Sequence, residues 1–472
     1  MGDLREWLAK VGKLGELKTL QGVHWDLEIG VITEIVGRQP EKPAILFDNI
    51  PDYPPSYRVL ANPLGSRDRF ALALGLPPGM SFRELLQEWR RRSHEMQLVA
   101  PRFVAGGPVM ENVDVGEEVD VLKFPTPRWH EKDGGRFIGT GDMVITRTPE
   151  GDWVNCGAYR IMVHDRYNIG LQIAPAHHGY WHLQEWRARG EPMPVAIVVG
   201  MDPLLFLASC NELPAGLNEY YYAGAIQGEP VEVTKGPITG LPIPATAEIV
   251  LEGFVDPQEM RPEGPFGEFP GYYGGGIRDQ PVVRVEAIYH RNDPIILGMP
   301  PLRPPDAGLD YRNKIMQAGL LWDVLEAAGV PDVTGACLYT AHFLAVVSIR
   351  QRYPGHAKQA ARLAAASNIG VNRYTVVVDD DIDVTDLDEV LWAMCTRVDP
   401  ERDIELLREC LSSPLEPIIP PERKSYPVIA RVVIDAARPY EWRDRFPEVV
   451  ASSPDLKQQV LAHWGDKLQG II

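Results

Sequence analysis

The chain has 472 residues, of which 45% are apolar and 24% are charged, and this composition predicts a soluble globular protein of two or three domains. Its net charge of −18 argues against non-specific nucleic-acid binding, which needs a basic face. No apolar run is long enough to span a bilayer, and the N-terminus lacks the hydrophobic segment of a signal peptide, so we expect a cytoplasmic protein. The five cysteines include no C-x-x-C pair, which argues against a zinc ribbon.

Residues 1–115 predict an N-terminal α/β domain. Apolar side chains recur at helical spacing in residues 4–14, and Ser81 is placed to cap a helix over residues 82–92. Strands are predicted at residues 31–36 and 43–47.

Residues 116–305 predict a β-rich central domain. Residues 143–148 and 153–159 are expected to form a hairpin, because Pro-Glu-Gly-Asp joins them. Further strands are predicted at residues 195–199, 247–252 and 282–289, and one helix at residues 179–189. This spacing favours an antiparallel sheet that is closed or folded into a barrel.

A linker helix is predicted within residues 306–330, and residues 331–472 follow as a third domain. Strands and helices alternate there, which predicts an α/β sandwich. The strands are expected at residues 343–350 and 374–378, and the helices at residues 357–366, 386–397 and, at the end of the chain, 454–468.

The segment at residues 261–276, RPEGPFGEFPGYYGGG, combines Glu263 and Glu268 with glycine, proline and aromatic residues. Carboxylates are usually kept away from aromatic clusters unless they are paired. The two acids are five residues apart, so a straight strand would point them to opposite faces, and only a turned backbone can aim both at one substrate. Gly264-Pro265 can supply that turn. A surface turn with two solvated acids is the alternative.

Besides the two glutamates, the sequence contains other residues that could act in a catalytic or binding site. Asn155 and Arg160 are five apart on a predicted strand, so they can converge only if the strand bulges near Gly157. An arginine here could hold a carboxylate with two hydrogen bonds, or it could be an edge residue in water.

His178 and His182 are four residues apart, but Gly179 stands where a zinc protease needs glutamate, so a zinc protease is not expected. If Asn155, His178 and Glu219 meet, they form an oxygen-rich site that suits Mn²⁺ or Mg²⁺ better than Zn²⁺. The chain has no phosphate-binding P-loop and no G-x-S-x-G elbow.

From about residue 140 to its end, the chain resembles the UbiD family of reversible decarboxylases, which includes polyprenyl-hydroxybenzoate, ferulic acid, vanillate and protocatechuate decarboxylases. The matching stretches follow the family order and are VNCGAYRIMVHD, NEYYYAGA, AEIVLEG, PEGPFGEFPGYY, GHAKQAA, and DDDIDV followed by LWAMCTRVDP. The resemblance implies an α+β multidomain fold. Its parts would be an N-terminal α/β domain, a central split β-barrel that binds flavin, and a C-terminal α/β dimerisation domain with a terminal helix.

The resemblance also implies a cofactor and residue roles. The cofactor would be prenylated FMN, supplied by a flavin prenyltransferase, with Mn²⁺ and K⁺ at its phosphate. The implied catalytic residues are Arg160, Glu263 and Glu268, the implied metal ligands are Asn155, His178 and Glu219, and the implied cofactor-binding residues are these ligands with Arg160, His177, Ser209 and Arg431.

Two of these positions depart from the family. Arg431 stands where the family usually has a lysine near the cofactor phosphate, and Arg and Lys are not interchangeable. His177 stands where the ferulic acid enzymes have glutamine, which points away from a cinnamate-type pocket.

The expected partners are a small aromatic or heteroaromatic acid, CO₂ and a second copy of the chain in a homodimer or higher homo-oligomer, without nucleic acid or membrane. Two alternatives stay open: a catalytically silent subunit of a multi-component aromatic carboxylase, and a plain FMN oxidoreductase. The intact Arg160, Glu263 and Glu268 set argues against the silent subunit.

Overall fold

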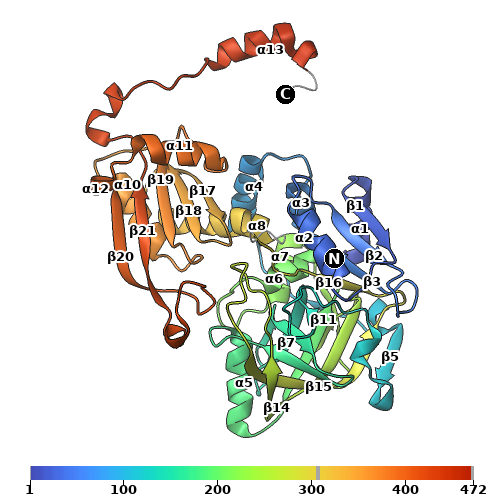
Figure 1. The fold of residues 1–472 in the computed structure, drawn as a ribbon. Helices are drawn as coiled ribbons and strands as arrows, with labels where there is room; N and C mark the ends of the chain where they lie inside the picture. Colours follow the sequence, from blue (N-terminus) through green and yellow to red (C-terminus); the bar gives the residue numbers. More distant parts are fainter. Residues whose placement is uncertain (1, 304–308, 469–472) are drawn as a thin grey trace.

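The computed structural model describes residues 2–303 and 309–468. Its chain runs through an N-terminal α/β part, a β-rich central part and a C-terminal α/β part (Figure 1). The predicted α+β multidomain fold class is confirmed. No helix of the described ranges is long and apolar enough to cross a membrane.

The N-terminal part contains a four-stranded sheet in the order β1-β2-β3-β16, in which β1 and β2 are parallel and β16 adds in parallel beside β3. Ser81 caps α4 as predicted, and the structure adds a capping box: Ser81 accepts from the backbone N–H of Glu84, whose carboxylate accepts from Ser81. The elements are α1 (Leu4–Lys13), β1 (Leu17–Gln21), α2 (Glu28–Gly37), β2 (Ala44–Asp48), β3 (Arg58–Ala61), α3 (Arg67–Ala73), α4 (Phe82–Glu95) and, much later in the chain, β16 (Ile295–Gly298).

The strand predicted at residues 31–36 is wrong, because this segment lies within helix α2. The β-branched residues Val31 and Ile35 are exposed, so their strand propensity does not decide the structure. The buried face of α2 consists of Ile29, Gly30, Thr33 and Gly37, at helical spacing. A Cβ atom on Gly30 would lie 1.7 Å from the backbone oxygen of Trp129, so the small residues let the helix backbone pack closely on the central part.

The central part is built on one antiparallel sheet of nine strands, with β5 paired to β15 and the others in the order β6-β9-β10-β15-β14-β11-β7-β8. The sheet curls into a half-barrel, and β7 and β8 form the predicted hairpin. The strands are β5 (Asn112–Val115), β6 (Arg136–Gly139), β7 (Asp142–Arg147), β8 (Val154–Gly157), β9 (Arg160–Val163), β10 (Asn168–Gln172), β11 (Met193–Val199), β14 (Ile249–Glu263) and β15 (Arg278–His290).

Helices and a small sheet flank this half-barrel. The three helices are α5 (His178–Arg189), α6 (Pro203–Ser209) and α7 (Glu219–Gln227), and the small sheet has the order β13-β12-β4. Its strands are β4 (Arg102–Phe103), β12 (Glu232–Lys235) and β13 (Pro242–Pro244), and short 3₁₀ helices lie at η1 (Pro108–Met110), η2 (Gly116–Glu118) and η3 (Val121–Lys123).

The predicted linker helix is present but not uniform. It consists of α8 (Leu309–Tyr311), a π-helical turn η4 (Arg312–Gln317) and α9 (Ala318–Ala327). π-Helical turns inside α-helices occur frequently at functional sites. Residues 306–308 of the predicted linker lie outside the described residues.

The C-terminal part is a five-stranded sheet in the order β17-β18-β19-β21-β20 with helices on both faces. Alternate residues of the strands pack with α10 on one face and with α11 on the other. The helix α13 stands apart from the rest of the chain (Figure 1). The elements are β17 (Val333–Tyr339), β18 (Leu344–Ile349), α10 (His356–Ala366), β19 (Tyr374–Asp379), α11 (Leu387–Arg397), α12 (Pro400–Asp403), β20 (Ile404–Leu411), η5 (Pro421–Arg423), β21 (Val428–Asp435), η6 (Tyr440–Arg445) and α13 (Pro454–Leu468).

Replacing Gly30 with alanine should lower the free energy of unfolding by about 1–3 kcal/mol, because the added methyl group meets the backbone of Trp129. Denaturant titration followed by circular dichroism measures this change. The matched control is Gly12→Ala in helix α1, where an added Cβ has no heavy atom within 4 Å and should stabilise the helix by up to about 1 kcal/mol. Equal stability of the two variants would show that α2 does not pack on Trp129 as described.

Candidate active site

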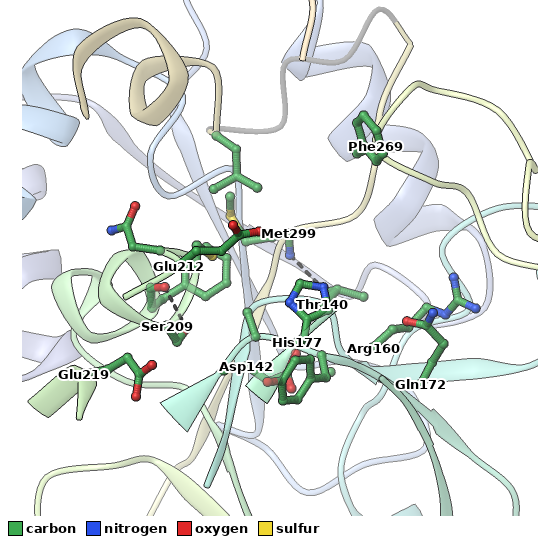
Figure 2. A pocket seen from close by; sticks show the side chains of 18 of the residues that line it. Thr140, Asp142, Arg160, Gln172, His177, Ser209, Glu212, Glu219, Phe269 and Met299 are labelled. Carbon is green, nitrogen blue, oxygen red and sulfur yellow. Dashed lines mark hydrogen bonds between the residues drawn. The ribbon is translucent and has the colours of Figure 1, made fainter. Parts of the chain in front are cut away.

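A cavity of about 620 Å³ lies in the central part, and this volume is typical of sites for small molecules and cofactors. Its walls come from the half-barrel strands, from the helices α5 to α7, from the loop after β14 and from the linker helix. Figure 2 shows Ser209 and Glu219 on one side of this cavity and Arg160 and Gln172 on the other.

Arg160 connects the two glutamates of the segment at residues 261–276. Its Nε donates to Oε1 of Glu263 over 2.8 Å and its Nη2 to Oε2 of Glu263 over 2.6 Å, while its Nη1 donates to Oε1 of Glu268 over 2.7 Å. Both carboxylates therefore converge on Arg160. The alternative of a surface turn with solvated acids is excluded, because Glu263 is 1% exposed and Glu268 is 9% exposed.

The backbone turns between the two acids at the predicted place. Glu263 ends β14, and Gly264 follows with φ of +91°, a conformation that favours glycine. A Cβ on Gly264 would lie 2.5 Å from the oxygen of Gly276, which is the other end of the loop. Two glycines thus let the segment fold back closely enough to aim both carboxylates at one guanidinium.

Aromatic rings enclose this ion cluster. The ring of Phe266 packs at 4.2 Å from the ring of Phe137, and the guanidinium carbon of Arg160 lies 5.3 Å from the Phe266 ring centre and 5.9 Å from that of Phe137. Burial raises the pKa of Glu268 above its usual value, although the charge of Arg160 opposes this. The carboxyl of Glu268 is therefore easier to protonate than a solvated glutamate.

The loop that carries Glu268 also contacts the C-terminal part. Phe269 stacks on His342 with ring centres 5.5 Å apart and on Phe343 with ring centres 5.8 Å apart. Lys424 donates a hydrogen bond to the backbone oxygen of Gly274. The position of Glu268 therefore depends on two parts of the chain.

Asn155 and Arg160 reach the cavity in a different way from the one predicted. The predicted bulge near Gly157 is wrong, because β8 ends at Gly157 and β9 begins at Arg160. Ala158 and Tyr159 form the break, and the backbone N–H of Ala158 donates to the oxygen of Ser209 over 3.1 Å. Asn155 and Arg160 thus lie in two different strands, so the alternation of side chains along a single strand does not apply to this pair.

Asn155, His178 and Glu219 all line the cavity around the end of β8. Oε2 of Glu219 accepts from the backbone N–H of Cys156 over 2.7 Å. The hydroxyl of Tyr159 accepts from Nδ2 of Asn155 and from the backbone N–H of Gly179, and so ties Asn155 to the start of α5, where His178 lies. The three side chains come from separate elements that are linked by these bonds.

The chemistry of this group fits a hard divalent ion. Glu219 is 3% exposed, forms no ion pair within the described residues, and burial raises its pKa to about 7. A bound cation would stabilise its ionised form. In the described ranges, no three His, Cys, Asp or Glu side chains group closely enough to hold a metal by themselves, so an ion here needs the amide oxygen of Asn155 as well.

The remaining predicted cofactor residues divide into two groups. His177 and Ser209 line the cavity, where His177 lies with its ring 5.6 Å from that of Tyr159 and Ser209 donates to the oxygen of Phe206 over 2.8 Å. Arg431 does not line it: its guanidinium donates to the backbone oxygens of Ala365 and Leu411 in the C-terminal part. Arg431 thus holds backbone segments of the C-terminal part together and does not reach the cavity.

Sequence reasoning missed several residues that line the cavity, among them Asp142, Gln172 and Arg312. Gln172 is paired in register with Arg160, so strand pairing would have found it. Asp142 is 2% exposed, its Oδ2 has no hydrogen-bond partner, and burial raises its pKa well above the usual value. No motif marks Asp142 or Arg312, because only the tertiary fold brings them to this wall.

Comparison with known proteins places the chain in a family. The family models for the N-terminal, Rift-related and C-terminal domains of 3-octaprenyl-4-hydroxybenzoate carboxy-lyase, the UbiD models, match residues 8–89, 102–304 and 310–436. The chain is 34% identical to pyrrole-2-carboxylic acid decarboxylase of Pseudomonas aeruginosa, with 98% of each chain covered. It is 30% identical to phenolic acid decarboxylase of Bacillus subtilis, with 100% of this chain and 99% of the relative covered.

Solved structures agree. The UbiD-class enzyme HmfF from Pelotomaculum thermopropionicum in complex with FMN superposes with a TM-score of 0.86 at 30% identity, covering 98% of this chain and 100% of that one. An evolved dimeric form of HmfF in complex with prFMN gives a TM-score of 0.83 at 29% identity, with the same coverage. Vanillic acid decarboxylase of Sedimentibacter hydroxybenzoicus in closed form gives 0.82 at 31% identity, covering 100% and 99%. Sequence, fold and cavity together show that this chain belongs to the UbiD family of carboxy-lyases.

Proposed function

We propose that the protein catalyses the reversible, non-oxidative decarboxylation of an aromatic or heteroaromatic carboxylic acid with prenylated FMN as its cofactor. The observation that carries this proposal is the buried Arg160, which holds two carboxylates at the wall of a cavity of about 620 Å³. The names of the relatives, a pyrrole-2-carboxylic acid decarboxylase and a phenolic acid decarboxylase, support this class of substrate.

The reaction needs an electron sink and a proton. Loss of CO₂ leaves an electron pair on an aromatic or vinylic carbon, and the cofactor, when bound, takes up that charge. In this proposal Arg160 orients the substrate carboxylate through the two N–H groups of its guanidinium that the glutamates leave free, since three of its five N–H donors are already used. The carbon that loses CO₂ then receives a proton from the protein.

Glu268 is the proposed proton donor and Glu263 its ionised partner. Glu263 accepts two hydrogen bonds from Arg160 and forms a buried ion pair with it. Glu268 accepts one on Oε1, so its second oxygen can carry a proton, and burial favours that protonated form. In this proposal Glu263 pairs with Arg160, and Glu268 supplies the proton.

The phosphate end of the cofactor is proposed to lie at the other side of the cavity. Asn155, His178 and Glu219 would hold Mn²⁺ there, with K⁺ nearby and Ser209 and His177 lining the cofactor site. Production of active protein would require a flavin prenyltransferase, and assembly is proposed to be a homodimer or higher homo-oligomer.

The function is tested by producing the protein together with a flavin prenyltransferase and measuring CO₂ release from a panel of pyrrole, furan and phenolic carboxylic acids under anaerobic conditions. Release from at least one acid is expected, with prenylated FMN identified by mass spectrometry. Glu268→Gln should lower the rate by about 10²–10⁴-fold, because it removes the proton donor. The control Glu286→Gln changes an exposed glutamate of β15 and should leave the rate unchanged.

Unmodified FMN with redox activity would instead favour the oxidoreductase. An absence of CO₂ release from every acid by protein that carries prenylated FMN would favour the silent subunit and contradict the proposal.

The rate should also depend on pH through Glu268. A proton donor acts only in its protonated form, so kcat should be high below the pKa of Glu268 and should fall as the pH rises through it. Because burial raises that pKa, the fall should lie above the range of a solvated glutamate. Initial rates between pH 5 and pH 9 measure this profile, and a kcat that rises throughout this range would exclude Glu268 as the donor.

Removal of the metal should weaken flavin binding. Glu219→Gln removes the charge that an ion at Asn155 and His178 would require, so it should reduce Mn²⁺ binding, measured by electron paramagnetic resonance, by at least about 10-fold. Dialysis of the wild-type protein against a chelator should likewise lower its FMN affinity. Glu185→Gln, at an exposed position of α5, is the control. Mn²⁺ binding that is equal in the two variants would remove Glu219 from the metal site.

A further inference from the structure

Arg312 lies where two cavities meet. It is the first residue of the π-helical turn η4, and it lines both the cavity of about 620 Å³ and a neighbouring one of about 590 Å³. The two cavities share one wall, formed by residues 210–213 and Arg312. A guanidinium at this place can contact a ligand in the first cavity.

The hydrogen bonds of Arg312 do not neutralise its charge. Nη2 donates to the backbone oxygen of Cys210 and Nη1 donates to Oδ1 of Asn313 over 3.3 Å, while Nε is buried without a hydrogen-bond partner. None of the ion pairs within the described ranges includes Arg312, and Glu212 acts on it only at longer range. Burial lowers its pKa, but an arginine stays protonated in proteins.

Two of the three arginines that are buried in the described ranges have carboxylate partners, and the third, Arg431, donates to backbone oxygens. Arg69 pairs with Glu16, and Arg397 pairs with Asp379 and Asp381. A buried charge without a partner is costly, so such residues are usually paired. We therefore expect Arg312 to bind an anion that is not part of the chain.

Arg312 lies at the end of the cavity that carries Ser209. Cys210, whose oxygen it contacts, directly follows Ser209 at the end of α6. Ser209 and Glu219 lie on the opposite side of the cavity from Arg160 in Figure 2. Arg160 is already engaged by two carboxylates, so an anion at the Ser209 end has Arg312 as its nearest arginine of the cavity wall.

The cavity wall carries more carboxyl groups than arginines, so a bound anion needs a cation beside it. Four carboxyl groups and two arginines line it, and the carboxyl groups are Asp142, Glu212, Glu219 and Glu268. A phosphate group would be repelled by such a wall unless cations lie beside it. One metal ion at Glu219 and one guanidinium at Arg312 would together offset a phosphate dianion.

We propose that Arg312 binds the phosphate group of the flavin mononucleotide and supplies the cationic contact that Arg431 does not. The inference rests on the proposed function, since it assumes a flavin mononucleotide in this cavity. It assigns recognition of the phosphate to the linker helix, which joins the central and C-terminal parts.

The test compares FMN with riboflavin, which lacks the phosphate, on the full-length protein in the presence of Mn²⁺. Quenching of flavin fluorescence gives both dissociation constants. Arg312→Gln should weaken FMN binding by about 10- to 100-fold and leave riboflavin binding within about 3-fold, because only the phosphate contact is lost. Arg312→Lys keeps the charge but not the planar fork, so its FMN affinity should be intermediate.

Arg431→Gln is the matched control, and it should leave the ratio of FMN to riboflavin affinity unchanged. Equal weakening of both flavins by Arg312→Gln would show that Arg312 is only structural, and the proposal would fail. An unchanged FMN affinity with a raised KM for the aromatic acid would make Arg312 a substrate contact and would also overturn it. If the wild-type protein binds neither flavin, the proposed function fails together with this inference.

Discussion

The hydrogen-bonded ion cluster of Arg160 with Glu263 and Glu268 is the interaction on which the candidate site depends. Each carboxyl group is almost completely buried, where a polar side chain needs a hydrogen-bond or ion-pair partner. One guanidinium serves both, with two hydrogen bonds to one glutamate and one to the other. Because Arg160 gives the two glutamates different numbers of hydrogen bonds, the two carboxyl groups have different surroundings, although they are the same residue type in one loop.

The cluster constrains the fold around it. Arg160 must begin a strand at a break, and Glu263 must end one just before a tight turn. The turned loop then has to be held in place, and the C-terminal part does so through the stack of Phe269 on His342. Glu268, the proposed proton donor, therefore belongs to the central part in sequence but depends on a neighbouring part for its position. Any motion between these parts would change the geometry of Glu268.

The cavity is acidic, in agreement with the net charge of −18 of the whole chain. An anionic ligand can bind only where cations are concentrated, and the structure offers two such ends. Arg160 marks one end, and Glu219 with Arg312 marks the other, where a metal ion would add its charge. In the proposals above, the substrate carboxylate lies at the Arg160 end of the cavity and the phosphate at the Arg312 end.

The sequence by itself determined the features that depend on local pattern. The helix cap at Ser81, the hairpin of β7 and β8, and the turn at Gly264 between Glu263 and Glu268 were all predictable, because neighbouring residues decide them. Tertiary contact decided the rest. Val31 and Ile35 lie in a helix because Gly30 packs on Trp129, and Arg312 rather than Arg431 reaches the cavity because the linker helix passes it. Such contacts join residues far apart in the chain, so no local pattern contains them.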